Sequence, residues 1–177
     1  RQMYKNNVQD GLSELFYEDG TRKNDTEYLN GVFHGKGARY HKNGRIEQEF
    51  EYKNGVLNGR IRNYTDFGVL IENLNYENGR LSGLNEWYSD DGVLKTVASY
   101  KNGLLEGIMQ SFDENGVLKK SRTYKDDKLN GTAKYYFHSA PTDENADSEQ
   151  DPHYRSDEGI AVKWIFSNVN GAYEGPV

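Results

Sequence analysis

The sequence predicts an all-β protein, an elongated single-layer antiparallel β-meander or solenoid built from repeats of 24 residues with two strands each. Three features predict it: one set of glycines recurs every 24 residues, a second set keeps the same interval, and two rows of aromatic residues follow it. The first glycines are Gly11, Gly35, Gly59, Gly83, Gly107 and Gly131, and the aromatic rows are Tyr4, Tyr28, Tyr52, Tyr76, Tyr100, Tyr124 and Phe16, Tyr40, Tyr64, Tyr88, Phe112, Tyr136. A fixed period of this length indicates a repeat array. Residues 1–177 are therefore expected to form one array, with repeats starting near residues 4, 28, 52, 76, 100 and 124.

Each repeat is expected to contain two turns. The first is an Asn-Gly pair such as Asn54-Gly55, because Asn and Gly adopt positive φ at little cost. It recurs at 30–31, 78–79, 102–103 and 170–171, while Asn6-Asn7 and Asp126-Asp127 replace it in two repeats. The second is an Asp-Gly or Asn-Gly pair at 19–20, 43–44, 91–92 and 115–116, with Phe67-Gly68 as the exception.

The segments between the turns are about seven residues long, which is the usual length of a strand. Apolar residues alternate along them: Ile46, Phe50 and Tyr52 point to one side, and Glu47, Glu49 and Glu51 to the other. Alternation with a period of two predicts one buried face and one face in water. We expect about 12 strands in all, with the Tyr52 and Tyr64 rows both on the buried side and the three glutamates in water.

Composition excludes several classes of function. The chain has no cysteine, so disulfides, thiolate metal sites and cysteine nucleophiles are absent, and its net charge of −6 is spread over both signs. Nucleic acid is therefore not an expected partner. No apolar run approaches the ~20 residues of a transmembrane helix, so no transmembrane segment is expected. The four histidines have no nucleophile partner fixed by a motif, and the glutamates have no pocket. The sequence thus predicts no enzyme, no cofactor and no metal site.

The pattern breaks once, after Tyr136. The turn expected near residue 140 is replaced by an acidic insertion at 139–158, whose composition favours disorder, and the alternation resumes over 160–175. Aligning the last Asn-Gly pair on Asn54-Gly55 places Val162, Phe166 and Asn168 at the positions of Ile46, Phe50 and Tyr52. We expect the insertion to project from a hairpin tip without changing the strand register, so that an Asn-Gly turn could replace it.

The insertion holds the predicted partner-binding residues. Its alternating Asp143, Asn145, Asp147 and Glu149 are similar to the start of a calcium loop, but no glycine follows Asp147 and Tyr154 stands where the bidentate Glu belongs. No calcium site is therefore expected. Tyr and Arg are enriched in interface hot spots. The residues expected to contact a partner are Asp143, Glu144, Asp147, Glu149, Tyr154 and Arg155.

The pattern Tyr-x-Asn-Gly-x-Leu-x-Gly, followed by Tyr or Phe and then Asp/Asn-Gly-x-Leu, resembles the MORN repeat, and more closely its bacterial, antitoxin-labelled variant. The resemblance covers residues 4–137 and resumes at 160–175. It implies a ribbon-like sheet of β-hairpins, in a family whose members serve as protein-interaction scaffolds, membrane-associated tethers or appendages of enzymes. Classical members often have Gly-x-Gly before the aromatic residue. Here only Gly35-Lys36-Gly37 matches that feature, so lipid binding is not carried over.

Two hypotheses for function follow. The first is a non-catalytic scaffold for protein–protein interaction, with an antitoxin- or immunity-like role as its narrower form. The alternative is a carbohydrate or cell-surface binding module that uses the aromatic rows to stack on sugar rings. Exposure of the tyrosines distinguishes them, because a sugar-binding row must be open to solvent. The compartment stays undetermined, but the start at Arg1 within a repeat leads us to expect an upstream segment and favours an exported or cell-envelope location.

Overall fold

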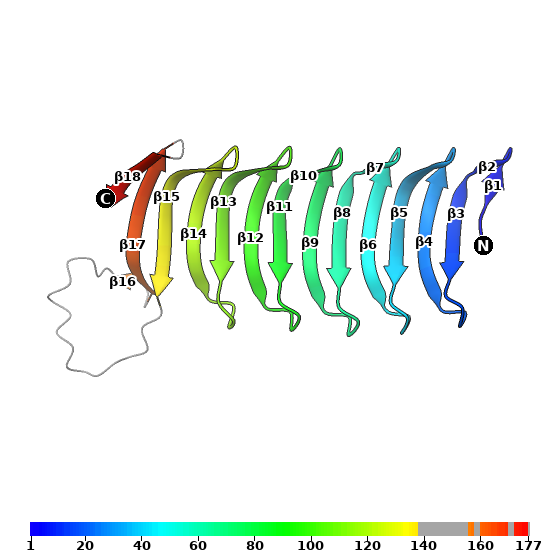
Figure 1. The fold of residues 1–177 in the computed structure, drawn as a ribbon, viewed down its shortest axis with the longest axis horizontal. Helices are drawn as coiled ribbons and strands as arrows, with labels where there is room; N and C mark the ends of the chain where they lie inside the picture. Colours follow the sequence, from blue (N-terminus) through cyan, green and yellow to red (C-terminus); the bar gives the residue numbers. More distant parts are fainter. Residues whose placement is uncertain (138–155, 158–159, 170–171, 177) are drawn as a thin grey trace.

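A computed structural model of the chain describes residues 1–137, 156–157, 160–169 and 172–176. The described residues form strands and turns without a helix. Sixteen of the strands lie side by side in one elongated, open sheet, and β1 and β2 pair with each other at its N-terminal end (Figure 1). The long strands are β3 (Gly11–Phe16), β4 (Arg22–Leu29), β5 (Val32–Tyr40), β6 (Ile46–Lys53), β8 (Gly59–Tyr64), β9 (Leu70–Glu77), β11 (Gly83–Tyr88), β12 (Leu94–Lys101), β13 (Leu104–Phe112), β14 (Leu118–Lys125), β15 (Lys128–Phe137) and β17 (Ile160–Val169). The short ones are β1 (Tyr4–Lys5), β2 (Val8–Gln9), β7 (Val56–Leu57), β10 (Arg80–Leu81), β16 (Ser156–Asp157) and β18 (Ala172–Pro176).

From β3 to β15 neighbouring strands follow sequence order and pair antiparallel, so the all-β meander predicted from the repeats is confirmed. The twelve long strands match the expected number of about 12, and six short segments bring the total among the described residues to 18. Two of the short segments, β7 and β10, arise because one residue before the repeat glycine interrupts the ladder, whereas β1, β2, β16 and β18 lie towards the two ends of the array. β7 is separated from β8 by Asn58, and β10 from β11 by Ser82. The same stretch is continuous in β5.

The Asn-Gly turns stack on one another along one long edge of the sheet. Asn54 and Gly55 both have positive φ, 51° and 79°, as the type I′ turn of a tight hairpin requires. The turn glycine also donates its N–H to a carbonyl of the preceding repeat, from Gly55 to Phe33 at 2.7 Å and from Gly79 to Leu57 at 2.8 Å. These bonds join consecutive repeats, as expected for an array held together by contacts between neighbours.

The second set of turns forms the opposite long edge and is held by side-chain caps. The hydroxyl oxygens of Thr65 and Ser89 accept the N–H groups of Val69 and Val93, each at 3.1 Å. Asp113 caps its own turn in the same way, accepting the N–H of Val117 at 2.9 Å. In the first two repeats the residue at this position instead contacts the next repeat. The Tyr17 hydroxyl, for example, donates to the Tyr40 carbonyl at 2.8 Å.

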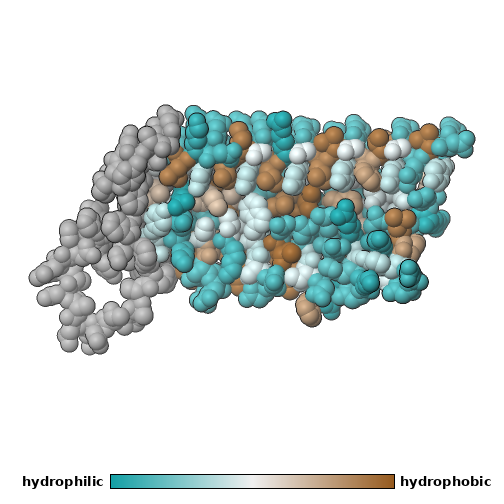
Figure 2. All heavy atoms as spheres, in the orientation of Figure 1, coloured by the Kyte–Doolittle hydropathy of each residue, from teal (hydrophilic) through white to brown (hydrophobic). Residues whose placement is uncertain are grey.

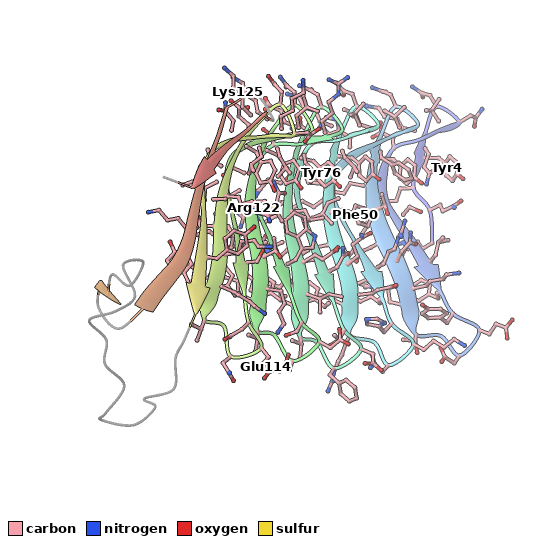
Figure 3. All side chains as sticks on the ribbon, turned by 60° about the vertical axis from the view of Figure 1, so that its left-hand side comes forward. Tyr4, Phe50, Tyr76, Glu114, Arg122 and Lys125 are labelled. Carbon is pink, nitrogen blue, oxygen red and sulfur yellow. The ribbon has the colours of Figure 1, made fainter. Side chains whose placement is uncertain are left out.

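The core is one row of side chains on a single face of the sheet. Phe50, Ile61 and Leu74 are its buried apolar cluster, with Tyr52, Leu57, Tyr76, Leu81 and Trp87 packed against them. Towards both ends the row continues with smaller residues, among them Ser13, Thr26, Asn85, Ala98 and Ala133, all of which are buried. In Figure 3, Phe50 and Arg122 lie at a similar height on the sheet and Tyr76 lies nearer the Asn-Gly turns. No second layer covers this face within the part of the chain that the structure describes.

The expected placement of the two tyrosine rows is half right. Tyr52 and Tyr76 lie on the core face and are half-buried, as predicted. The Tyr64 row, however, lies on the other face, where the Tyr64 hydroxyl donates to Glu49 at 2.8 Å and the Tyr40 hydroxyl to Asp25 at 2.7 Å. The physical reason is the two-residue period of a strand: Tyr64 is three positions from Ile61, so the two side chains must point to opposite faces.

The glutamates are also only partly as expected. Glu47 is exposed, but Glu49 and Glu51 are half-buried, and Glu49 accepts hydrogen bonds from Tyr64 and Arg62. A carboxylate on this face is therefore a structural acceptor as well as a solubilising charge.

The strand after the insertion pairs with the one before it. β15 and β17 are antiparallel neighbours, with Ala133 opposite Phe166 and Gly131 opposite Asn168. Phe50 is likewise opposite Gly37, and Tyr52 opposite Gly35. Part of the segment expected to be loop is strand, because Ser156–Asp157 form β16 on the far side of β17.

Candidate interaction surface

The face opposite the core, called here the polar face, carries a row of polar and charged side chains across the sheet. Pairing places Asp25 opposite Ala38, Ala38 opposite Glu49, and Glu49 opposite Arg62. The row continues through Asn73, Glu86, Val97, Gln110 and Ser121. It crosses the sheet from β4 to β14 without being covered by another described element.

Fixed polar contacts organise the half of this face nearer β3. Arg22 bridges Glu14 and Asp25 at 2.9 and 3.2 Å, and Arg62 pairs with Glu49 at 3.2 Å. The hydrogen bond from Arg62 to Glu49 raises the pKa of the Arg62 guanidinium. Partly exposed ion pairs contribute little to stability. Their effect here is to hold charged groups in fixed directions on an open surface.

Three tyrosines of the polar face have raised pKa values. Burial raises the pKa of Tyr40, Tyr64 and Tyr88 above the ordinary value of 10.0, and hydrogen bonds to Asp25, Glu49 and Glu86 raise the pKa further. Both effects disfavour the phenolate, since it loses hydration and faces a negative carboxylate.

Phenol titration followed by ultraviolet absorbance tests this contact. We expect Glu49→Gln to lower the pKa of Tyr64 towards 10.0 and to leave that of Tyr88 unchanged. Because the folded-state pKa is raised, the folded chain binds the proton more tightly. The associated stability is present below pH 10 and is lost as the pH rises through the raised value. An unchanged Tyr64 titration in Glu49→Gln would contradict the contact.

A shallow cavity of about 280 Å³ opens beside Arg62. Its lining is Lys36, Gly37, Glu49, Phe50, Glu51, Arg60 and Arg62. The volume is below the range of about 300–1,000 Å³ typical of small-molecule sites, and charges of both signs line it. Among the residues that the structure describes, no group of His, Cys, Asp and Glu side chains is arranged to hold a metal ion.

The half of the polar face over β11 to β14 is different in character. Leu84 and Ile108 are 50% and 55% exposed, at the position occupied by Lys36 and Arg60 in earlier repeats. Leu84 lies opposite Ser99 and Ile108 opposite Thr123. We call Leu84, Val97, Ser99, Ile108 and Thr123 the apolar patch. It carries no formal charge, while charged residues lie in the repeats beside it.

Sequence reasoning and structure point to different residues. The predicted Asp143, Glu144, Asp147, Glu149, Tyr154 and Arg155 all lie outside the described residues. The apolar patch was missed. The signal that could have found it is the change at one position of the repeat, from Lys36 and Arg60 to Leu84 and Ile108, on the face that alternation assigns to water.

The fold and this surface define a class of protein, a β-hairpin repeat array with one core face and one open polar face. The family model of the MORN repeat variant matches residues 33–54, 81–102 and 105–126. The hairpin units are thus MORN repeats, and the chain belongs to the MORN repeat family. No curated protein matched the sequence. Within the described part of the chain, no helix is long and apolar enough to cross a membrane.

Proposed function

We propose that the protein is a non-catalytic scaffold that binds another protein across its polar face, with the apolar patch at the centre of the contact. The observation that carries the proposal is the exposure of Leu84 and Ile108, 50% and 55%, on a face otherwise built from polar groups. Family membership agrees with it, because MORN repeats are generally associated with scaffolds that bind proteins or membranes.

The arrangement resembles the anatomy of a protein–protein interface. Such interfaces have an apolar centre low in charge and a polar rim. Here the uncharged patch is bordered by Glu86 on β11 and, towards β8, by Arg60 and Arg62. Glu86 accepts a hydrogen bond from Asn73 at 2.5 Å, and Arg62 is paired with Glu49. Side chains already held in place lose less conformational entropy on binding.

The acidic insertion, which lies towards the C-terminal end of the array, is proposed to add contacts to the same partner. Asp143, Glu144, Asp147 and Glu149 supply negative charge, and Tyr154 and Arg155 are of the types enriched in hot spots. In its narrower form, the proposed function is antitoxin- or immunity-like, with a single protein as the bound partner.

Two substitutions taken from the chain's own repeats test the patch. Lys36 and Arg60 occupy the repeat position of Leu84 and Ile108. Leu84→Lys and Ile108→Arg therefore install residue types that the fold already contains at this position, and the fold is expected to accept them. With a partner recovered by the full chain, we expect the double variant to weaken binding at least about tenfold, a loss of about 1.4 kcal/mol, while circular dichroism and thermal unfolding stay unchanged.

The matched control is Leu12→Lys, which makes the same kind of change at the same repeat position but outside the patch. Leu12 is 39% exposed, and the variant is expected to bind as the unmodified chain does. Undiminished binding by the Leu84→Lys, Ile108→Arg variant would contradict the proposed site. Equal loss in the Leu12 variant would indicate a contact that does not depend on the patch.

The carbohydrate alternative has weaker support. Tyr52 and Tyr76 are half-buried, and the rings of this row face other rings: Phe33 and Tyr52 lie 5.2 Å apart between centroids, and Trp87 and Tyr100 lie 6.2 Å apart. Rings packed in this way offer a sugar their edges more than their faces. Specific glycan binding that is lost in Tyr76→Ala would favour this alternative over the protein scaffold.

A further inference from the structure

The two long edges of the array carry opposite charge. The turns at 5–8, 29–32, 53–56, 77–80, 101–104 and 125–128 form the upper edge, and those at 17–21, 41–45, 65–69, 89–93 and 113–117 form the lower edge. Exposed cations of the upper edge are Lys5, Lys53, Arg80, Lys101, Lys125 and Lys128, against Glu77, Asp126 and Asp127. Acidic residues of the lower edge are Glu18, Asp19, Asp66, Asp90, Asp91, Asp113 and Glu114, against Lys42 and Arg45. Figure 3 shows Lys125 and Glu114 at these opposite edges.

This separation is not a consequence of net charge. Of the 22 Lys and Arg residues, two lie beyond Phe137, and of the 28 Asp and Glu residues, eight do. Residues 1–137 therefore hold twenty of each and are neutral as a whole. Within this neutral part, the upper turns hold six cations against three acidic residues and the lower turns seven acidic residues against two cations.

Each edge also presents apolar groups among its charges. Phe67, on the lower edge, is 78% exposed, the highest value among the large hydrophobic residues that the structure describes. It stands at a turn position where other repeats have Asp19, Asn43, Asp91 or Asn115. On the upper edge Leu29, Val32, Val56 and Leu104 are 41–45% exposed, and Figure 2 shows hydrophobic residues spaced along that edge.

The spacing of the groups selects the kind of partner. Consecutive turns of one edge are two strands apart, about 10 Å at the usual strand spacing of ~4.8 Å. Upper and lower edges share this spacing because the same repeats build both. A second copy of the chain therefore presents complementary charge at a matching interval.

We propose that copies of this protein associate edge to edge, the lower edge of one against the upper edge of the next. Phe67 contacts the exposed aliphatic side chains of the facing edge, and Asp66 and Asp90 face Lys53, Arg80 and Lys101 of the second copy. The contact joins two different surfaces, so it does not close into a dimer. An assembly of any length keeps a free lower edge at one end and a free upper edge at the other, to which a further copy can bind. Like charge opposes contact between two upper edges or two lower edges. The polar face is not used, so the inference is independent of the proposed function.

Sedimentation velocity of the full chain over a range of concentrations tests the association. At about 20 mM salt, where charges interact over about 20 Å, we expect the weight-average sedimentation coefficient to rise steadily with concentration. At about 500 mM, where the screening length is about 4 Å, we expect it to be constant. A monomer at every concentration in low salt would overturn the proposal, as would a closed dimer or salt-independent association.

Variants separate the two components of the contact. Phe67→Asn installs the residue of the equivalent turns and is expected to fold normally while losing most of the concentration dependence. Lys53→Glu with Lys101→Glu makes both edges acidic. Asp66→Lys, Asp90→Lys and Glu114→Lys together make the lower edge basic like the upper one, and they install the residue type that Lys42 provides at the same repeat position. Each charge variant alone is expected to stay monomeric, and their mixture to associate again. Association of either variant alone, or a mixture that remains monomeric, would contradict edge pairing.

Discussion

We expect Leu74→Ala to lower the free energy of unfolding by about 3 kcal/mol and Leu84→Ala to lower it by less than about 1 kcal/mol. The two residues are of one type in neighbouring strands, but Leu74 is 8% exposed within the cluster with Phe50 and Ile61, whereas Leu84 is 50% exposed on the other face. The removed methyl groups leave a cavity in one case and open surface in the other. Urea denaturation followed by circular dichroism measures both changes.

Each leucine is the control for the other, because both variants replace a strand leucine by alanine and differ only in the face of the sheet on which the side chain lies. Equal losses from Leu74→Ala and Leu84→Ala would show that both faces are packed and would contradict a single-layer core. A larger loss from Leu84→Ala would reverse the assignment of the faces.

The second large effect is expected from Gly37→Ile, which should destabilise the chain by about 3 kcal/mol or more. Gly37 lies opposite Phe50 in the core row, and a Cβ atom built on it would stand 2.4 Å from the Phe50 ring and 2.7 Å from the Asp25 carbonyl oxygen. The Phe50 ring therefore fills the space that a side chain at position 37 would occupy. Thermal and urea unfolding of the variant measure the cost.

A compensating substitution makes this prediction specific. In the next repeat the same two positions are filled by Ile61 and Leu74, which also lie opposite each other. Gly37→Ile combined with Phe50→Leu recreates that pair and is expected to recover the part of the stability that is lost to the Phe50 ring, while the close approach to the Asp25 carbonyl remains. Additive losses in the double variant would show that the two side chains do not share one space, because coupled neighbours are non-additive.

The sequence was sufficient to predict the repeats, the turns and the class of fold. The constant period located every Asn-Gly turn up to residue 127, because positive φ at Asn54 and Gly55 is a local requirement that only a few residue types satisfy. The Tyr52 row could be placed on the core face because it shares the alternation of Phe50.

Other features depend on how strands are placed beside one another. The prediction for Tyr64 was wrong: it lies three positions from the core residue Ile61 along the same strand, and this odd spacing places its side chain on the face opposite the core. Two short segments, β7 and β10, are separated from β8 and β11 by the single residues Asn58 and Ser82, and the repeat pattern does not distinguish these repeats from those with a continuous strand. The apolar patch joins Leu84 on β11 to Ile108 on β13 across β12, and no local pattern brings two residues 24 positions apart together until the strand order is known.

Hydroxyl-radical footprinting of the full chain tests the central claim, that one face of the sheet is its core and the other is open for binding. The method compares residues of the same type within one molecule. Leu84 and Leu74 are 50% and 8% exposed, and Ile108 and Ile61 are 55% and 7% exposed. We predict oxidation rates several-fold higher at Leu84 and Ile108 than at their buried counterparts, falling when the partner protein is bound. Equal rates within each pair, or faster oxidation of Leu74 and Ile61, would contradict the account.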